Sequence, residues 1–87
     1  MLVCHHNFHL MQIHIGNLNR MTTARHLAGL FLPFGMVHTV KIISDRITGH
    51  SLGYGYIEME PNCGKLAVQR LDHRLFMNYY MEVNEVD

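Results

Sequence analysis

The chain lacks an excess of charge of either sign. Its seven basic and seven acidic residues cancel, so the formal net charge of the 87 residues is zero with the eight histidines counted as neutral. No bulk attraction therefore draws the protein to nucleic acid at neutral pH, and any such binding depends on locally placed side chains. Protonation of the histidines would make the protein cationic in mild acid.

Paired cysteines and long apolar runs are also missing. Cys4 and Cys63 show no metal-ligand or redox spacing, which favours free thiols in a reducing compartment over a disulfide scaffold. No apolar run approaches the roughly 20 residues of a membrane span. Residues 1–10, MLVCHHNFHL, lack the apolar stretch and cleavage site of a secretory signal. These absences predict a soluble cytoplasmic protein without a membrane contact.

The chain does have enough apolar residues for one folded domain. Hydrophobic residues make up 48% of the sequence and charged residues 16%, a globular composition. The length suits one domain and leaves no room for two. We expect residues 11–87 to form this domain and residues 1–10 to be a flexible, His-rich extension.

Hydrophobic periodicity predicts the element order strand, helix, strand, strand, helix, strand. The predicted strands cover residues 11–18, 37–45, 52–59 and 80–86. One helix is capped by Thr22 or Thr23 and ended by Pro33 and Gly35, and the other starts at Pro61. This order predicts an α+β, ferredoxin-like βαββαβ fold, in which a four-stranded antiparallel sheet carries both helices on one face. The predicted core consists of Ile13, Ile15, Leu27, Phe31, Phe34, Val40, Ile42, Ile57, Val68, Leu71 and Val83.

The third predicted strand, LGYGYIEM, carries two tyrosines on one face. Successive side chains of a strand point to opposite faces, so Leu52, Tyr54, Tyr56 and Glu58 share one side. The alternate residues are small and then apolar, as a surface packed against helices requires. The tyrosines are therefore expected on the open face of the sheet.

The chain resembles an RNA recognition motif domain from about Met11 to Val86. That family's octamer runs Lys/Arg-Gly-Phe/Tyr-Gly/Ala-Phe-Val-x-Phe/Tyr, and residues 52–59 match it in register, with Leu52 for the basic residue and Met59 for the last aromatic. The family's hexamer on the first strand is similar to residues 13–18, IHIGNL, with His14 in an aromatic position. Residues 45–49, DRITG, look like the loop before the octamer.

The resemblance implies binding of single-stranded RNA through bases stacked on exposed rings, each stack contributing about 1–3 kcal/mol. Tyr54 and Tyr56 would be the main rings, with His14 as the third. Tyr80 would extend them, Lys41 would meet a phosphate, and the Glu58 carboxylate would accept from base amines. The expected RNA-binding residues are His14, Lys41, Leu52, Tyr54, Tyr56, Glu58, Tyr80 and Asn84.

Leu52 departs from the family pattern because it cannot contact phosphate as a cation does. Together with the zero net charge, this predicts binding that is micromolar or weaker and of low sequence specificity. Single-stranded DNA stays open as a second ligand, and a protein partner or a homodimer would raise the affinity. No cofactor is expected.

A peptide-binding variant of the same family is the alternative. Such variants use Arg-x-Phe before the last strand together with acids on the first helix, and Arg74-Leu75-Phe76 stands at the corresponding place. The predicted first helix contains no acid, however, and the stacking tyrosines are retained. Phe76 is therefore expected to pack over the edge of the core.

Catalysis and metal binding are weaker interpretations. Acylphosphatases share the topology, and Gly16 to Arg20 superficially resembles their phosphate loop, but the glycine-rich cradle and an acid–base pair are absent. Arg20 is interpreted as a solvated loop residue, and no enzyme is predicted. Zinc or nickel ligands are available in Cys4, His5, His6 and His9, but their segment has nothing to fix their geometry, so no functional metal site is expected.

Overall fold

The computed structural model describes residues 9–86. Cys4, His5 and His6 of the predicted extension lie outside them. The four-stranded sheet contains β1 (Met11–Gly16), β2 (Val37–Ser44), β3 (Ser51–Met59) and β6 (Glu82–Glu85). The helices are α1 (Ala24–Phe31), the 3-10 segment η1 (Leu32–Phe34) and α2 (Pro61–Leu71), and a short hairpin is formed by β4 (Leu75–Phe76) and β5 (Tyr79–Tyr80).

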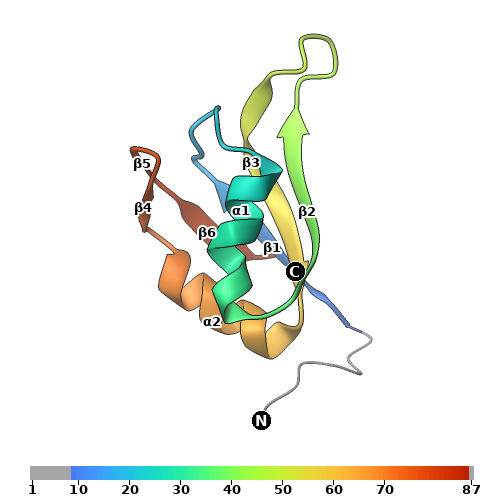
Figure 1. The fold of residues 1–87 in the computed structure, drawn as a ribbon, viewed down its shortest axis with the longest axis vertical. Coiled ribbons are helices and arrows are strands. Elements are labelled where there is room, and N and C mark those ends of the chain that lie inside the picture. The colour runs from blue at the N-terminus through green and yellow to red at the C-terminus, as the bar shows by residue number, and fades with distance from the viewer. Residues whose placement is uncertain (1–8, 87) are drawn as a thin grey trace.

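The sheet has the antiparallel order β2-β3-β1-β6, and both helices cover the same side of it (Figure 1). The ferredoxin-like α+β prediction is therefore confirmed. The chain's first and last strands lie next to each other, since Ile15 pairs with Val83 across β1 and β6. The opposite side of the sheet carries neither helix.

The core lies between the helices and the inner face of the sheet. Ile13, Ile15 and Ile57 are fully buried there, as predicted from the alternation of their strands. Leu27, Phe31, Leu71 and Val83 are also buried, whereas the predicted core residues Phe34, Val40, Ile42 and Val68 are only partly buried against this cluster. The structure adds five apolar residues that were not predicted in the core: Met11, Leu18, Met59, Ala67 and Met81.

Both helices begin at a side-chain cap. Thr23 accepts a hydrogen bond from the His26 backbone N–H, and the His26 ring accepts from the Thr23 N–H, which makes a reciprocal cap of α1. The Glu60 carboxylate caps α2 by accepting from the Cys63 N–H, and Pro61 follows in the first turn, where its missing N–H costs nothing. No helix within residues 9–86 is long and apolar enough to cross a membrane.

The prediction of one strand over residues 80–86 is wrong. Tyr79 and Tyr80 pair with β4 in the separate hairpin, and β6 begins only at Glu82. Met77 and Asn78 both have positive φ, as a two-residue hairpin turn requires, so the chain reverses locally before it reaches the sheet. The buried Met81 lies between the two strands.

Candidate nucleic-acid interface

The open face of the sheet carries a row of polar and aromatic side chains that crosses all four strands. Lys41 of β2 pairs with Tyr56 of β3, Tyr56 pairs with His14 of β1, and His14 pairs with Asn84 of β6. Ile43 pairs with Tyr54 in the next outward position along β2 and β3. The register therefore brings together four predicted site residues, His14, Lys41, Tyr56 and Asn84, with Tyr54 beside them.

Three rings gather at the centre of this face, and we call them the ring cluster: His14, Tyr54 and Tyr56. The His14 ring centroid lies 5.6 Å from that of Tyr54 and 5.4 Å from that of Tyr56. The two tyrosine centroids are 6.1 Å apart, with their planes at 83°. These distances fall within the range of favourable aromatic contacts, so the rings hold each other in place. All three side chains are half-buried, and each retains surface that faces solvent.

A hollow of about 420 Å³ lies beside the ring cluster at the loop end of the sheet. His14 and Tyr54 contribute rings to its wall, and the β1–α1 loop, the hairpin and β6 close its sides. We call it the loop-end hollow. Its lining comprises His14, Gly16, Asn17, Leu18, Arg20, Leu52, Gly53, Tyr54, Tyr79 and Glu82.

A second hollow of about 600 Å³ lies on the other side of the ring cluster, over β2 and β3. Tyr56, Lys41 and Glu58 line it together with Gln12, Thr39, Val40 and Ile43. One carboxylate oxygen of Glu58 accepts a 2.8 Å hydrogen bond from the Thr39 hydroxyl, which fixes the acid on this face. Each hollow thus contains aromatic surface, one basic residue and one acidic residue.

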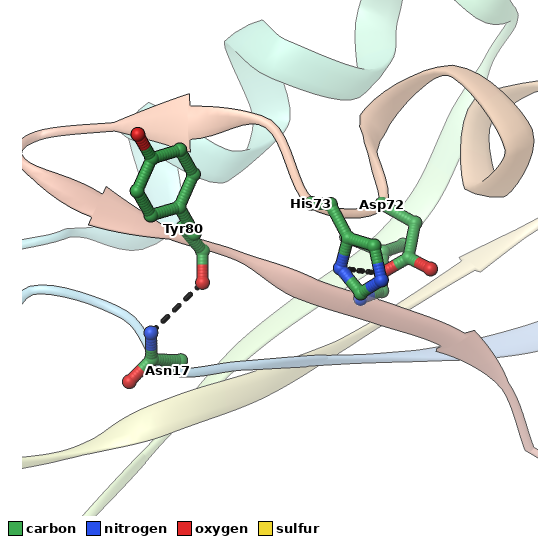
Figure 2. A network of polar contacts seen from close by, with 5 residues as sticks. Asn17, Asp72, His73 and Tyr80 are labelled. Atoms are coloured by element: carbon green, nitrogen blue, oxygen red, sulfur yellow. Dashed lines mark hydrogen bonds and ion pairs between the residues drawn. The ribbon is translucent and has the colours of Figure 1, made fainter.

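The structure places Tyr80 differently from the expected site. Tyr80 lies in the hairpin outside the four-stranded sheet, and its side chain is 62% exposed. Its backbone carbonyl lies at the end of β1, where it accepts a 2.8 Å hydrogen bond from the Asn17 amide, while the ring points away from Asn17 (Figure 2). The neighbouring Tyr79 lines the loop-end hollow instead.

Tyr79 and Arg20 are the two candidate site residues that the sequence reasoning missed. Tyr79 was missed because the predicted last strand begins at Tyr80 and the hairpin that contains Tyr79 was not predicted. Asn78 was a signal of the turn, because asparagine tolerates the left-handed conformation more readily than most residues, and here it has φ 72°. Arg20 was interpreted as a solvated loop residue, and no pattern along the chain shows that its loop folds onto β3.

The segment of the peptide-binding alternative is partly occupied by the fold itself. Phe76 packs against the core, and its ring centroid lies 6.1 Å from that of His26 on α1. Arg74 and Leu75 are exposed. The expectation that Phe76 covers the edge of the core is therefore confirmed, and α1 has no acidic residue to accompany an Arg-x-Phe motif.

The β2–β3 loop is fixed by a carboxylate at its start. Asp45 accepts hydrogen bonds from the backbone N–H groups of Thr48 at 2.9 Å and Ile47 at 2.8 Å. These bonds, the Thr48 bond first, lower the pKa of Asp45 below its ordinary value. Within residues 9–86 no group of three or more side chains is arranged to hold a metal ion.

Known proteins of similar sequence and structure share this fold. The family model described as RNA recognition motif matches residues 13–82. RbpE of Nostoc sp., named as an RNA-binding protein, is 36% identical over 76 residues that cover 86% of this chain and 77% of RbpE. Embryonic polyadenylate-binding protein 2 of Rattus norvegicus is 34% identical over 82% of this chain but only 26% of its own length.

Two solved structures extend the comparison. The crystal structure of RNA-binding protein PG1 has a TM-score of 0.86 at 36% identity, over 87% of this chain and 93% of PG1. A complex of the SXL-lethal protein with RNA has a TM-score of 0.82 at 25% identity, over 91% of this chain and 48% of that one. The matched model spans most of the sequence. The chain therefore belongs to the RNA recognition motif family.

Proposed function

We propose that the protein binds single-stranded RNA on the open face of its sheet by stacking bases on the ring cluster. The observation that carries this proposal is the position of His14, Tyr54 and Tyr56, whose ring centroids lie within about 6 Å of one another on the face opposite α1 and α2. Relatives named as RNA-binding proteins and a structurally similar protein solved with RNA support the same ligand.

The polar residues around the ring cluster can each be given a role in binding from their chemistry. Single-stranded bases stack on aromatic side chains while their edges remain available for hydrogen bonds. Lys41 lies next to Tyr56 and supplies a cation for a phosphate. The fixed carboxylate of Glu58 accepts from a base amine, and Asn84, beside His14, offers both a donor and an acceptor.

Binding is expected to be weak and of low sequence specificity. Stacking accepts every base, since every base has an aromatic face, and phosphate contacts supply most of the salt-dependent affinity. Leu52 provides no charge at the edge of the ring cluster, and Lys41 and Arg20 are opposed by Glu58 and Glu82 in the same hollows. We assign this function to residues 11–87, which residues 1–10 precede in the sequence as an N-terminal extension.

Tyr79 takes the place proposed for Tyr80 at the end of the interface. It is 46% exposed and lines the loop-end hollow together with His14 and Tyr54, so a base leaving the ring cluster meets its side chain next. Tyr80 lies on the hairpin with its ring directed away from Asn17 at the end of β1 (Figure 2). This difference makes Tyr80 a control position for tyrosine substitutions.

The proposal is tested by fluorescence anisotropy with a labelled single-stranded RNA of random sequence at low salt. Tyr54→Ala and Tyr56→Ala should each weaken binding by about 1–3 kcal/mol, because each removes a stacking surface without opening a core cavity. Tyr80→Ala should bind as the parent does. Circular dichroism establishes that each variant is folded, and the same oligonucleotide as DNA measures the preference between the two nucleic acids. Parent-like affinity of both ring-cluster variants would show that stacking here is the wrong mechanism.

A further inference from the structure

The β1–α1 loop packs directly onto the octamer strand. The backbone N–H of Leu18 donates a 2.9 Å hydrogen bond to the carbonyl of Gly53. Gly53 has φ +84°, a conformation that L side chains rarely adopt, and a Cβ added there would lie 3.2 Å from the Leu18 carbonyl oxygen. The register between β2 and β3 also shifts here, from Ile43 opposite Tyr54 to Ser44 opposite Ser51. A local irregularity at Gly53 thus brings the loop against β3.

This contact places Arg20 beside the apolar first residue of the octamer. A Cβ added to Gly53 would lie 3.9 Å from Arg20 Nε, and Arg20 lines the loop-end hollow with Leu52, Tyr54 and His14. Leu52 is 42% exposed and carries no charge. The guanidinium group therefore lies at the edge of the ring cluster, where Leu52 supplies no positive charge.

Hydrogen bonds on both sides of Arg20 hold its loop in place. The Asn19 side chain accepts from the Met21 N–H at 2.8 Å and donates to the Met77 carbonyl of the hairpin turn at 3.0 Å. Asn17 donates to the Tyr80 carbonyl at 2.8 Å (Figure 2). Because the loop is anchored to the hairpin and to β3, the backbone of Arg20 is positioned before any ligand binds, which lowers the entropy cost of a contact.

The guanidinium group is available for an anion. Arg20 is exposed, and within residues 9–86 no carboxylate lies within ion-pair distance of it. Arginine presents a planar set of donors that matches phosphate oxygens in pairs. Glu82, on β6, lines the same hollow, and its carboxylate disfavours phosphate close to β6, so a bound backbone is expected to run along the loop side.

We infer that Arg20 contacts a backbone phosphate of the bound RNA and serves as the cation that the octamer lacks at Leu52. This inference rests on the proposed function, because it requires a nucleotide on the ring cluster. The phosphate adjoining the base on Tyr54 would meet Arg20 at the rim of the loop-end hollow. Arg20 is thus a phosphate-binding residue contributed by the loop and not by the octamer.

The test is a salt titration of RNA binding by the parent, Arg20→Gln and a matched control, Arg70→Gln. Arg70 is exposed in the last turn of α2, in the layer of helices on the other side of the sheet, so both variants lose one positive charge. Each phosphate neutralised on a single strand contributes about −0.7 to the slope of log affinity against log salt. Arg20→Gln should therefore make the slope less negative by about 0.7. Its loss of affinity relative to the parent should shrink about fivefold for each tenfold rise in salt. Arg70→Gln should keep the parent slope.

Two further variants separate a charge effect from a change in the loop. Arg20→Lys keeps the charge and should keep the slope, while Arg20→Gln combined with Leu52→Arg should recover it. If Arg20→Gln had the same slope as the parent while Tyr54→Ala still lost affinity, the role of Arg20 would be overturned and the stacking proposal would stand. Absence of RNA binding by the parent would overturn both.

Discussion

The two faces of β3 carry residues with opposite tasks. Ile57 and Met59 on the inner face are fully buried against the helices, whereas Tyr54, Tyr56 and Glu58 on the outer face remain accessible. The inner side chains contribute stability by leaving water. The outer rings are exposed to solvent in part, and our proposal assigns them to RNA recognition. In this proposal, the alternation of side chains along one strand separates folding on one face from binding on the other.

The alternation makes this separation depend on the register. A shift of one residue would turn Ile57 outward and bury the tyrosines. The pairing of Ile57 with Ile13 on one side and with Val40 on the other fixes the register through three apolar residues of the inner face. The position of the ring cluster is therefore a consequence of core packing, and substitutions on the two faces should affect different measurements.

The largest expected effect is on the inner face. Ile57→Ala should lower the free energy of unfolding by about 2–5 kcal/mol, because it removes buried methyl groups and leaves a cavity. Ile57→Val, which removes one carbon, should cost only about 0.5–1.5 kcal/mol and keep the protein folded for binding measurements. Urea unfolding followed by circular dichroism measures both. The milder variant should retain the RNA affinity of the parent; a large loss of affinity in a folded Ile57→Val would show that the faces are not independent.

An intermediate effect is expected at the edge of the outer face. Leu52→Arg adds a cation beside Tyr54 without removing a buried residue, since Leu52 is 42% exposed. The variant should bind RNA more tightly at low salt and steepen the slope of log affinity against log salt by about 0.7. The gain in RNA affinity over the parent should decrease as the salt concentration rises, because salt screens the added contact. Parallel salt lines for parent and variant would show that the added arginine neutralises no phosphate besides the one assigned to Arg20.

The smallest effect is expected in the β2–β3 loop, which belongs to neither face. The pKa of Asp45 is lowered by its hydrogen bonds from Thr48 and Ile47, so the ionised form stabilises the loop above the unfolded pKa. That contribution is lost as the pH falls through the lowered pKa of the folded state. Two-dimensional NMR should show the Thr48 and Ile47 amide signals titrating together in acid, below the ordinary range of aspartate. In Asp45→Asn these transitions should be absent, and their persistence would assign them to another group.

The strand pattern could be predicted because alternation is a local property of the sequence. Ile13, Ile15 and Ile57 alternate with polar or aromatic neighbours, so their burial and the outward position of Tyr54 and Tyr56 followed from period-two spacing. The cap at Thr23 and the start of α2 at Pro61 followed from local chemistry in the same way.

The features that could not be predicted depend on contacts between distant segments. The hairpin turn at Met77 and Asn78 needs positive φ at both residues, and methionine gives no signal for that conformation. The approach of Arg20 to Gly53 arises from a hydrogen bond between Leu18 and Gly53, 35 positions later in the chain. The partial burial of Phe34 reflects its place in η1, where the chain leaves the α-helical path.

NMR can show whether RNA binds to the outer face through the ring cluster. Chemical-shift changes would be mapped on the labelled protein while a random pool of single-stranded RNA is added. Binding through the ring cluster predicts the largest changes at His14, Tyr54 and Tyr56 and their strand neighbours, with Arg70 and the rest of the exposed surface of α2 unaffected. Changes centred on the helices, with the ring cluster silent, would contradict it.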